Sequence, residues 1–105
     1  MKKINIVIAD DHPVFRKGLI EVISSEDDMI IVAEAKDGES AVKAIKEKEP
    51  DIALVDVSMP KLSGFDVVRE IKKAEINTQI IFLTMHNEET LFKCALDLGI
   101  NGYLL

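Results

Sequence analysis

Acidic residues stand directly after two apolar runs of this sequence, and a threonine stands after a third. Asp10 and Asp11 end "NIVIADD", Asp56 ends "IALVD", and Thr84 ends "IIFLT". Adjacent carboxylates repel each other unless a cation or strong donors compensate. If these groups meet, ligation by oxygen alone favours Mg²⁺ or Mn²⁺ over zinc. Beside such a cation, one aspartate can attack an electrophilic phosphorus atom as a covalent nucleophile.

The apolar runs have the length and composition of β-strands. They lie at Ile4–Ala9, Met29–Ala33, Ile52–Val55, Ile80–Leu83 and Tyr103–Leu105. The segments between them have helical periodicity. Strict alternation of strands and helices predicts right-handed crossovers and a parallel sheet covered on both faces. Functional groups gather at the carboxyl ends of the strands in such sheets, so the three aspartates are expected to converge there.

Apolar stripes at helical spacing indicate where the helices lie. The clearest stripes are Phe15, Leu19, Val22 and Ile23; Gly64, Val67, Val68 and Ile71; and Leu91, Cys94, Ala95 and Leu98. Pro13 suits a first helical position, while Asn87 and Gly99 suit the two ends of the last helix. The continuous apolar character of the first, third and fourth strands predicts central positions for them in the sheet.

Length and composition limit the class of protein. The chain has 105 residues, a single cysteine and a net charge of -6. This length suits one globular domain, and one thiol excludes an internal disulfide. No segment has the form of a signal peptide or reaches membrane-spanning length, so we expect a cytoplasmic protein with no membrane partner. The negative charge argues against this chain wrapping nucleic acid by itself.

Taken together, the motifs resemble the receiver domain of bacterial two-component response regulators over essentially the whole chain. The stretches that carry the resemblance are "ADDHPVFRKGL", "DVSMPKLSGFDVVREI" and "GINGYLL". They are most similar to the LuxR, FixJ and NarL type, in which a helix-turn-helix DNA-binding domain follows the receiver. The resemblance implies a flavodoxin-like, doubly wound α/β fold whose parallel five-stranded sheet has the order 2-1-3-4-5.

The resemblance also implies roles for individual residues. Asp56 would accept a phosphoryl group from a sensor histidine kinase. Asp11 would bind Mg²⁺ directly, Asp10 through water and Ser58 through its backbone carbonyl, with Mn²⁺ as an alternative cation. Asp56 would be a metal ligand as well as the phosphoacceptor. The metal would also bridge a phosphoryl oxygen and offset charge in the transition state. Thr84 would hydrogen-bond the phosphoryl group once it is attached.

A switch and its partners follow from the same resemblance. Movement of Thr84, with Tyr103 turning inward, would change the surface around the fourth helix and the fifth strand. Pro60 and Gly64 would shape the loop after the phosphoacceptor. The chain would not be an enzyme in the metabolic sense, although it would catalyse its own phosphorylation and dephosphorylation. Expected partners are the kinase, a second copy of the chain on phosphorylation, and DNA only through a further domain.

The sequence departs from the family pattern at its carboxyl end. The family has a lysine immediately after the fifth strand, which would fall one position past Leu105, and then a fifth helix beside the first. We therefore expect residues 1–105 to be a trimmed receiver domain without its fifth helix and output domain. The alternative is a truncated domain that pairs with a second copy through the bared face of the sheet.

Simpler interpretations stay open for single residues. Asp10 and Asp11 could cap the first helix, where carboxylates are favoured. Thr84 could satisfy backbone groups at the strand end, and Tyr103 could be a packed strand aromatic.

The two histidines are not expected to be metal ligands. The spacing of His12 and His86 matches no metal-binding motif. We expect His12, which precedes Pro13, to be a loop or first-turn residue.

Two other functions compete with the receiver, and its output has an alternative of its own. A phosphohydrolase with an aspartyl nucleophile would usually carry a second acid two residues after it, where this chain has Ser58. A flavin-binding module needs a phosphate loop after the first strand, and Asp10 and Asp11 would repel that anion. A receiver that acts by protein contacts alone, without DNA binding, stays open.

Overall fold

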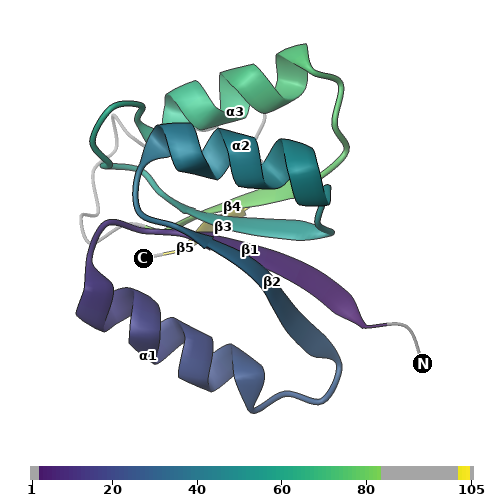
Figure 1. Cartoon of the computed structure of the whole chain (residues 1–105). Helices are drawn as coiled ribbons and strands as arrows, with labels where there is room; N and C mark the ends of the chain where they lie inside the picture. The colour runs from purple at the N-terminus through teal and green to yellow at the C-terminus, as the bar shows by residue number, and fades with distance from the viewer. Residues whose placement is uncertain (1–2, 84–101, 105) are drawn as a thin grey trace.

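The computed structural model describes residues 3–83 and the strand at 102–104. Strands and helices alternate along residues 3–83 (Figure 1). The elements are β1 (Ile4–Ala9), α1 (Pro13–Ser24), β2 (Met29–Ala35), α2 (Gly38–Lys48), β3 (Ile52–Asp56), α3 (Gly64–Lys73), β4 (Gln79–Leu83) and β5 (Gly102–Leu104).

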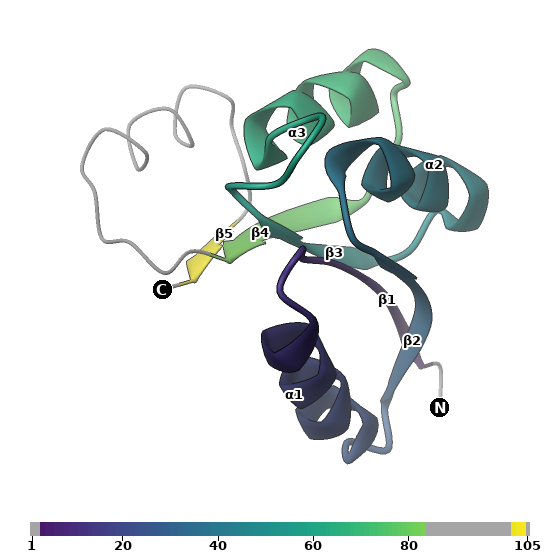
Figure 2. The ribbon, with the colours of Figure 1, turned by 60° about the vertical axis from the view of Figure 1, so that its left-hand side comes forward.

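The strands form one parallel sheet in the order β2-β1-β3-β4-β5. This order confirms the predicted flavodoxin-like α/β fold, and it places β1, β3 and β4 inside the sheet. Helix α1 lies on one face, and α2 and α3 lie on the other (Figure 1, Figure 2). Helices on both faces explain why the inner strands read as continuous apolar runs. The cover is less complete on the side of α1, where Leu54 and Ile81 are only partly buried.

The face beneath α2 and α3 carries the larger part of the core. Side chains from alternate strand positions, such as Val7 and Val55, pack there against Ile45 of α2. The predicted stripe of α3 is confirmed, because all four of its residues are buried. Phe65 of α3 also meets Phe82 of β4 edge to face, with ring centroids 5.0 Å apart. These contacts hold α3, and therefore the loop that precedes it, against β3 and β4.

The predicted stripe of the first helix is only partly right. Leu19 and Ile23 do pack against β1, but Val22 is 66% exposed and Phe15 is 39% exposed. Ile20 takes the inward position instead. The inner face thus runs through positions 16, 19, 20 and 23, which are spaced i, i+3, i+4 and i+7. The first residue of this inner face is Arg16, so the apolar pattern alone predicted Phe15 and Val22 as inward positions in place of Arg16 and Ile20.

The helix starts follow ordinary capping chemistry in α2 and α3. Asp37 caps α2 by accepting from the Ser40 N–H, and Ser63 and Asp66 form a reciprocal capping box at α3. Pro13 begins α1 as predicted, but the N-cap is His12, which makes no side-chain cap bond. The interpretation of the acidic pair as the cap of the first helix is therefore wrong.

Several predicted bounds shift by one or two residues. The second and third strands run on to Ala35 and Asp56, the fourth begins at Gln79, and the fifth spans Gly102–Leu104. Predictions for Thr84, His86 and the last helical stripe fall outside the described residues, as does the side chain of Tyr103. None of the described helices has the length and apolar character that crossing a membrane requires.

Candidate metal centre

The acidic residues predicted to converge do converge, at the carboxyl ends of β1 and β3. Ala9 pairs with Val55 in the parallel register, so the residues that follow them leave the sheet side by side. One ligand atom from each of Asp10, Asp11 and Asp56, together with one from His12, lies within 4.8 Å of the other three. The prediction that neighbouring strands would bring the three carboxylates together is confirmed.

Asp10 is buried and anchors the loop that follows β1. It is 1% exposed, and its Oδ1 accepts the backbone N–H of His12 at 2.7 Å. Arg16 donates from Nη1 to the Asp10 carbonyl at 2.7 Å and from Nε to Glu34 of β2 at 3.3 Å. The peptide between Asp10 and Asp11 is therefore held by a charged donor. This explains why the inward position in the first turn of α1 is an arginine.

Asp56 is 7% exposed and lies among like charges. The pKa of Asp56 is raised to about 6, chiefly by burial and also by the carboxylates of Asp10 and Asp11, against the lowering effect of the Ser58 N–H. That N–H donates to Asp56 Oδ1 at 3.1 Å. An anion held here is strained by desolvation and repulsion, and a bound cation would relieve both.

Asp56→Asn is expected to stabilise the cation-free domain at neutral pH by about 1 to 2 kcal/mol. This is less than the free energy equivalent to the whole pKa shift of Asp56, because the cluster is open to solvent on one side. The folded-state pKa of Asp56 is about 6, against an ordinary value of 3.8. The folded domain therefore holds the proton more tightly than the unfolded chain, and ionisation lowers the stability of the wild type. The gain in stability from Asp56→Asn should be complete above pH 6 and should disappear as the pH falls to 3.8, the ordinary pKa of an aspartate. Urea unfolding in a chelator across this range measures it, with the exposed turn variant Asp27→Asn as the charge control.

Asp11 supplies the observation that best fits a cation. Its Oδ1 is enclosed and has no hydrogen-bond partner among the described residues. A buried carboxylate oxygen without a donor is costly, and a metal ion satisfies it directly. Carboxylates dominate the donor set, which suits a hard divalent cation such as Mg²⁺ or Mn²⁺. The residues present therefore fit the cation that the sequence predicted.

His12 was predicted to be a loop or first-turn residue without a ligand role, and the structure places its ring in the cluster. Nδ1 lies 3.0 Å from Asp10 Oδ1, 3.1 Å from Asp11 Oδ1 and 3.5 Å from Asp56 Oδ2. The hydrogen bond to Asp10, followed by the charge of Asp11, raises the pKa of His12. The spacing between His12 and His86 gave no indication of a ligand role for His12. The informative feature was the position of His12 directly after two aspartates.

The loop after β3 has little space for side chains. The Gly64 N–H donates to the Val57 carbonyl at 2.8 Å, and a Cβ at Gly64 would lie 2.7 Å from the Asp56 carbonyl oxygen. The Pro60 carbonyl accepts the Gly38 N–H at 3.2 Å, which ties the loop to the start of α2. The expectation that Pro60 and Gly64 shape this loop agrees with these contacts. The metal role of the Ser58 carbonyl stays a prediction.

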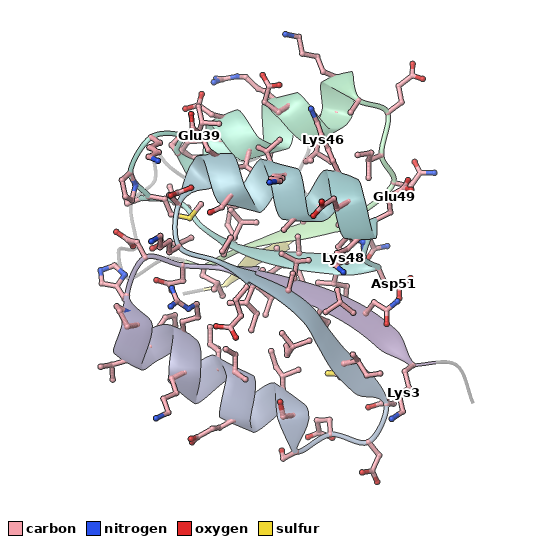
Figure 3. All side chains as sticks on the ribbon, viewed as in Figure 1. Lys3, Glu39, Lys46, Lys48, Glu49 and Asp51 are labelled. Atoms are coloured by element: carbon pink, nitrogen blue, oxygen red, sulfur yellow. The ribbon has the colours of Figure 1, made fainter. Side chains whose placement is uncertain are left out.

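The acidic cluster is distinct from a hollow at the other end of the sheet. That hollow lies at the amino ends of the central strands, where Glu49 and Asp51 are found among its lining residues. In Figure 3 these two residues lie at the end of α2 opposite Glu39, which marks the side of the carboxyl ends. The hollow is therefore remote from the converging carboxylates and adds nothing to their chemistry.

Comparison with known proteins agrees with this geometry. Residues 6–105 match the response regulator receiver domain family. The chain is 43% identical over 100 residues to the transcriptional regulatory protein YdfI of Bacillus subtilis, covering 95% of this chain and 46% of that protein. It is 36% identical over 103 residues to the transcriptional regulatory protein DegU of Brevibacillus brevis, covering 98% of this chain and 44% of that protein. The chain thus spans less than half the length of these relatives.

Solved structures show the same likeness. The receiver domain of the response regulator NarL from Mycobacterium tuberculosis superposes with a TM-score of 0.97 at 35% identity, over 100% of this chain and 85% of that one. A LuxR-family DNA-binding response regulator from Staphylococcus aureus superposes with a TM-score of 0.92 at 28% identity, over 97% of this chain and 85% of that one.

Proposed function

The chain belongs to the family of response regulator receiver domains, and on that premise we propose that it is a phosphorylation switch in which Asp56 accepts a phosphoryl group from a sensor histidine kinase. The observation that carries the proposal is the meeting of Asp10, Asp11 and Asp56 at one edge of the sheet, with an enclosed Asp11 oxygen that has no hydrogen-bond partner among the described residues. This set has a nucleophile and the oxygen donors for a divalent cation.

Asp56 is suited to act as the nucleophile. With a pKa of about 6 it is largely ionised at neutral pH, and it is more basic than an ordinary aspartate. In the transfer, a carboxylate oxygen of Asp56 bonds to phosphorus while the bond from phosphorus to the histidine nitrogen breaks. The product is an acyl phosphate on Asp56. Bound Mg²⁺ would offset the negative charge that gathers on the phosphoryl oxygens.

The other residues would bind the cation or respond to the phosphoryl group. Asp11 would ligate the cation directly, Asp10 through water, and the carbonyl of Ser58 would complete the protein ligands. Thr84 would hydrogen-bond the phosphoryl group, and its movement together with Tyr103 would change the surface that partners meet.

The output of the switch is proposed to be transcriptional. The two relatives named above are both described as transcriptional regulatory proteins. The receiver would act in the cytoplasm and control a DNA-binding domain, with dimerisation of phosphorylated copies as an intermediate step. Its own net charge of -6 leaves DNA contact to that other domain. A receiver that signals through protein contacts alone is the second candidate.

Phosphorylation is tested with acetyl phosphate and Mg²⁺, followed by intact mass spectrometry. Wild type is expected to gain the mass of one phosphoryl group in an adduct that hydroxylamine removes, as an acyl phosphate requires. Asp56→Asn should abolish the adduct, because the amide lacks the nucleophilic oxygen charge.

The control and the contrary result are equally direct. Asp27→Asn removes one charge from an exposed turn and should label like wild type. An adduct that survives in Asp56→Asn, or labelling of wild type that a chelator leaves unchanged, would contradict the assignment.

A further inference from the structure

We propose that His12 Nδ1 is a further protein ligand of the divalent cation and that it sets the metal preference of the site. The inference rests on the metal centre of the proposed function. The His12 side chain is 61% exposed, so crowding does not force it inward, yet Nδ1 faces the three carboxylates. The all-oxygen site expected from the sequence thereby gains a nitrogen donor.

The distances agree with ligands that share one cation. In an octahedral site with ligands at about 2.1 Å, neighbouring ligand atoms are about 3.0 Å apart. Nδ1 lies 3.0 Å from Asp10 Oδ1, 3.1 Å from Asp11 Oδ1 and 3.5 Å from Asp56 Oδ2. Nδ1 thus stands at or near the ligand-to-ligand spacing from Asp11 and Asp56, the two carboxylates that would bind the cation directly, while Asp10 would bind it through water.

The contact with Asp11 fits either an ion pair with a protonated ring or a cation that the two atoms share. Of the three contacts, only that to Asp10 has hydrogen-bond geometry, while Asp11 Oδ1 has no hydrogen-bond partner among the described residues. Without a proton between them, a ring nitrogen and a carboxylate oxygen at 3.1 Å repel each other. A cation shared by both atoms turns that repulsion into coordination. With the cation bound, the ring proton is on Nε2, the donation from Nδ1 to Asp10 is given up, and the Nδ1 lone pair is free for the metal.

The backbone holds His12 in place for this role. Its N–H donates to Asp10 Oδ1 at 2.7 Å, and its carbonyl accepts the Arg16 N–H at 2.9 Å. Pro13 follows with a restricted φ. The chemical identity of the side chain at this position therefore decides which donor atom the site gains.

A nitrogen donor changes which metals the site prefers. Mg²⁺ favours oxygen ligands, whereas first-row transition ions accept imidazole readily. We expect the affinity ratio of Mn²⁺ over Mg²⁺ to depend on His12. His12→Ala removes the donor, and His12→Asn replaces it with a side-chain oxygen on a shorter stem.

The test is calorimetric titration of MnCl₂ and of MgCl₂ into wild type, His12→Ala and His12→Asn at one fixed pH. His12→Ala should weaken Mn²⁺ binding about ten-fold and Mg²⁺ binding less than about two-fold. His12→Asn should bind Mg²⁺ at least as well as wild type while losing the Mn²⁺ preference. Pulsed electron paramagnetic resonance of bound Mn²⁺ should detect a coordinated imidazole nitrogen in wild type and none in either variant.

Three results would overturn the inference. The first is tighter binding of both metals by His12→Ala, which would mean that the ring competes with the cation. The second is an equal change in affinity for both metals. The third is the absence of nitrogen coupling in the wild type. Asp56 is intact in both variants, so the acetyl phosphate assay separates the two hypotheses. Normal labelling with an unchanged metal ratio refutes the ligand role of His12 alone, whereas absence of an adduct in wild type refutes the proposed function.

Discussion

Asp11→Asn is expected to abolish the stabilisation of this domain by Mg²⁺. The variant keeps the shape of the side chain but removes the charge that holds the cation, so we expect the affinity for Mg²⁺ to fall at least about 100-fold. At a concentration 100 times its dissociation constant, a ligand stabilises the folded state by about 2.7 kcal/mol. Wild type should show that gain, and Asp11→Asn should show almost none at the same concentration.

Urea unfolding with and without Mg²⁺ measures this difference. In a chelator, Asp11→Asn should be at least as stable as wild type, because one of three mutually repelling carboxylates is gone. The opposite signs of the two effects separate a metal ligand from a residue that only supports the fold. Asp27→Asn makes the same charge change in the exposed turn before β2 and should respond to Mg²⁺ like wild type. Full Mg²⁺ stabilisation of Asp11→Asn would exclude Asp11 as a ligand.

Gly38→Ala is expected to destabilise the domain by about 3 kcal/mol, because the new methyl group has no space. A Cβ at Gly38 would lie 2.0 Å from the carbonyl oxygen and 2.3 Å from the Cβ of Leu62, in the loop between β3 and α3. The clash is with backbone, which a side-chain rotation cannot relieve. The loop must move away, and the hydrogen bond from the Gly38 N–H to the Pro60 carbonyl is then lost.

The midpoint of urea unfolding should fall while its slope stays constant, which indicates a loss of stability and not of compactness. Gly18→Ala is the matched control, since a Cβ there meets nothing within 4 Å. Inside α1, that change should raise stability by about 0.5 to 1 kcal/mol, because alanine favours a helix more than glycine does. Equal stability of Gly38→Ala and wild type would show that the loop is not held against α2 in solution.

The same contact is relevant to the switch. The loop after β3 begins next to Asp56 and reaches the start of α2 through Pro60 and Gly38. Lys61 adds an ion pair, with its Nζ 3.5 Å from Glu39 Oε2. Its φ of 72° puts a non-glycine residue in the left-handed region, where backbone strain is stored. The segment beside the phosphoacceptor is thus linked to a second helix as well as to α3.

Several features could be predicted from the sequence because they depend on local patterns. Apolar runs and helical spacing located the strands and α3, and strict alternation required a parallel sheet. The convergence of Asp10, Asp11 and Asp56 then followed from topology, since parallel neighbours end at the same edge. The stripe of α1 was harder, because Arg16 occupies an inward position and its role is visible only once β2 supplies Glu34.

The sequence by itself determined the fold class, the strand order implied by its resemblance, and the set of acidic residues at one edge. These follow from periodicity and from the end of each strand, which short stretches of chain encode. Only the tertiary structure decided that His12 turns into the cluster, that Asp11 Oδ1 lacks a donor among the described residues, and that Gly38 has no space for a methyl group. Each of these depends on where atoms lie to within a few tenths of an ångström, and for His12 beside Asp56 and Gly38 beside Leu62 those atoms come from separate segments, which residue spacing along a chain does not encode.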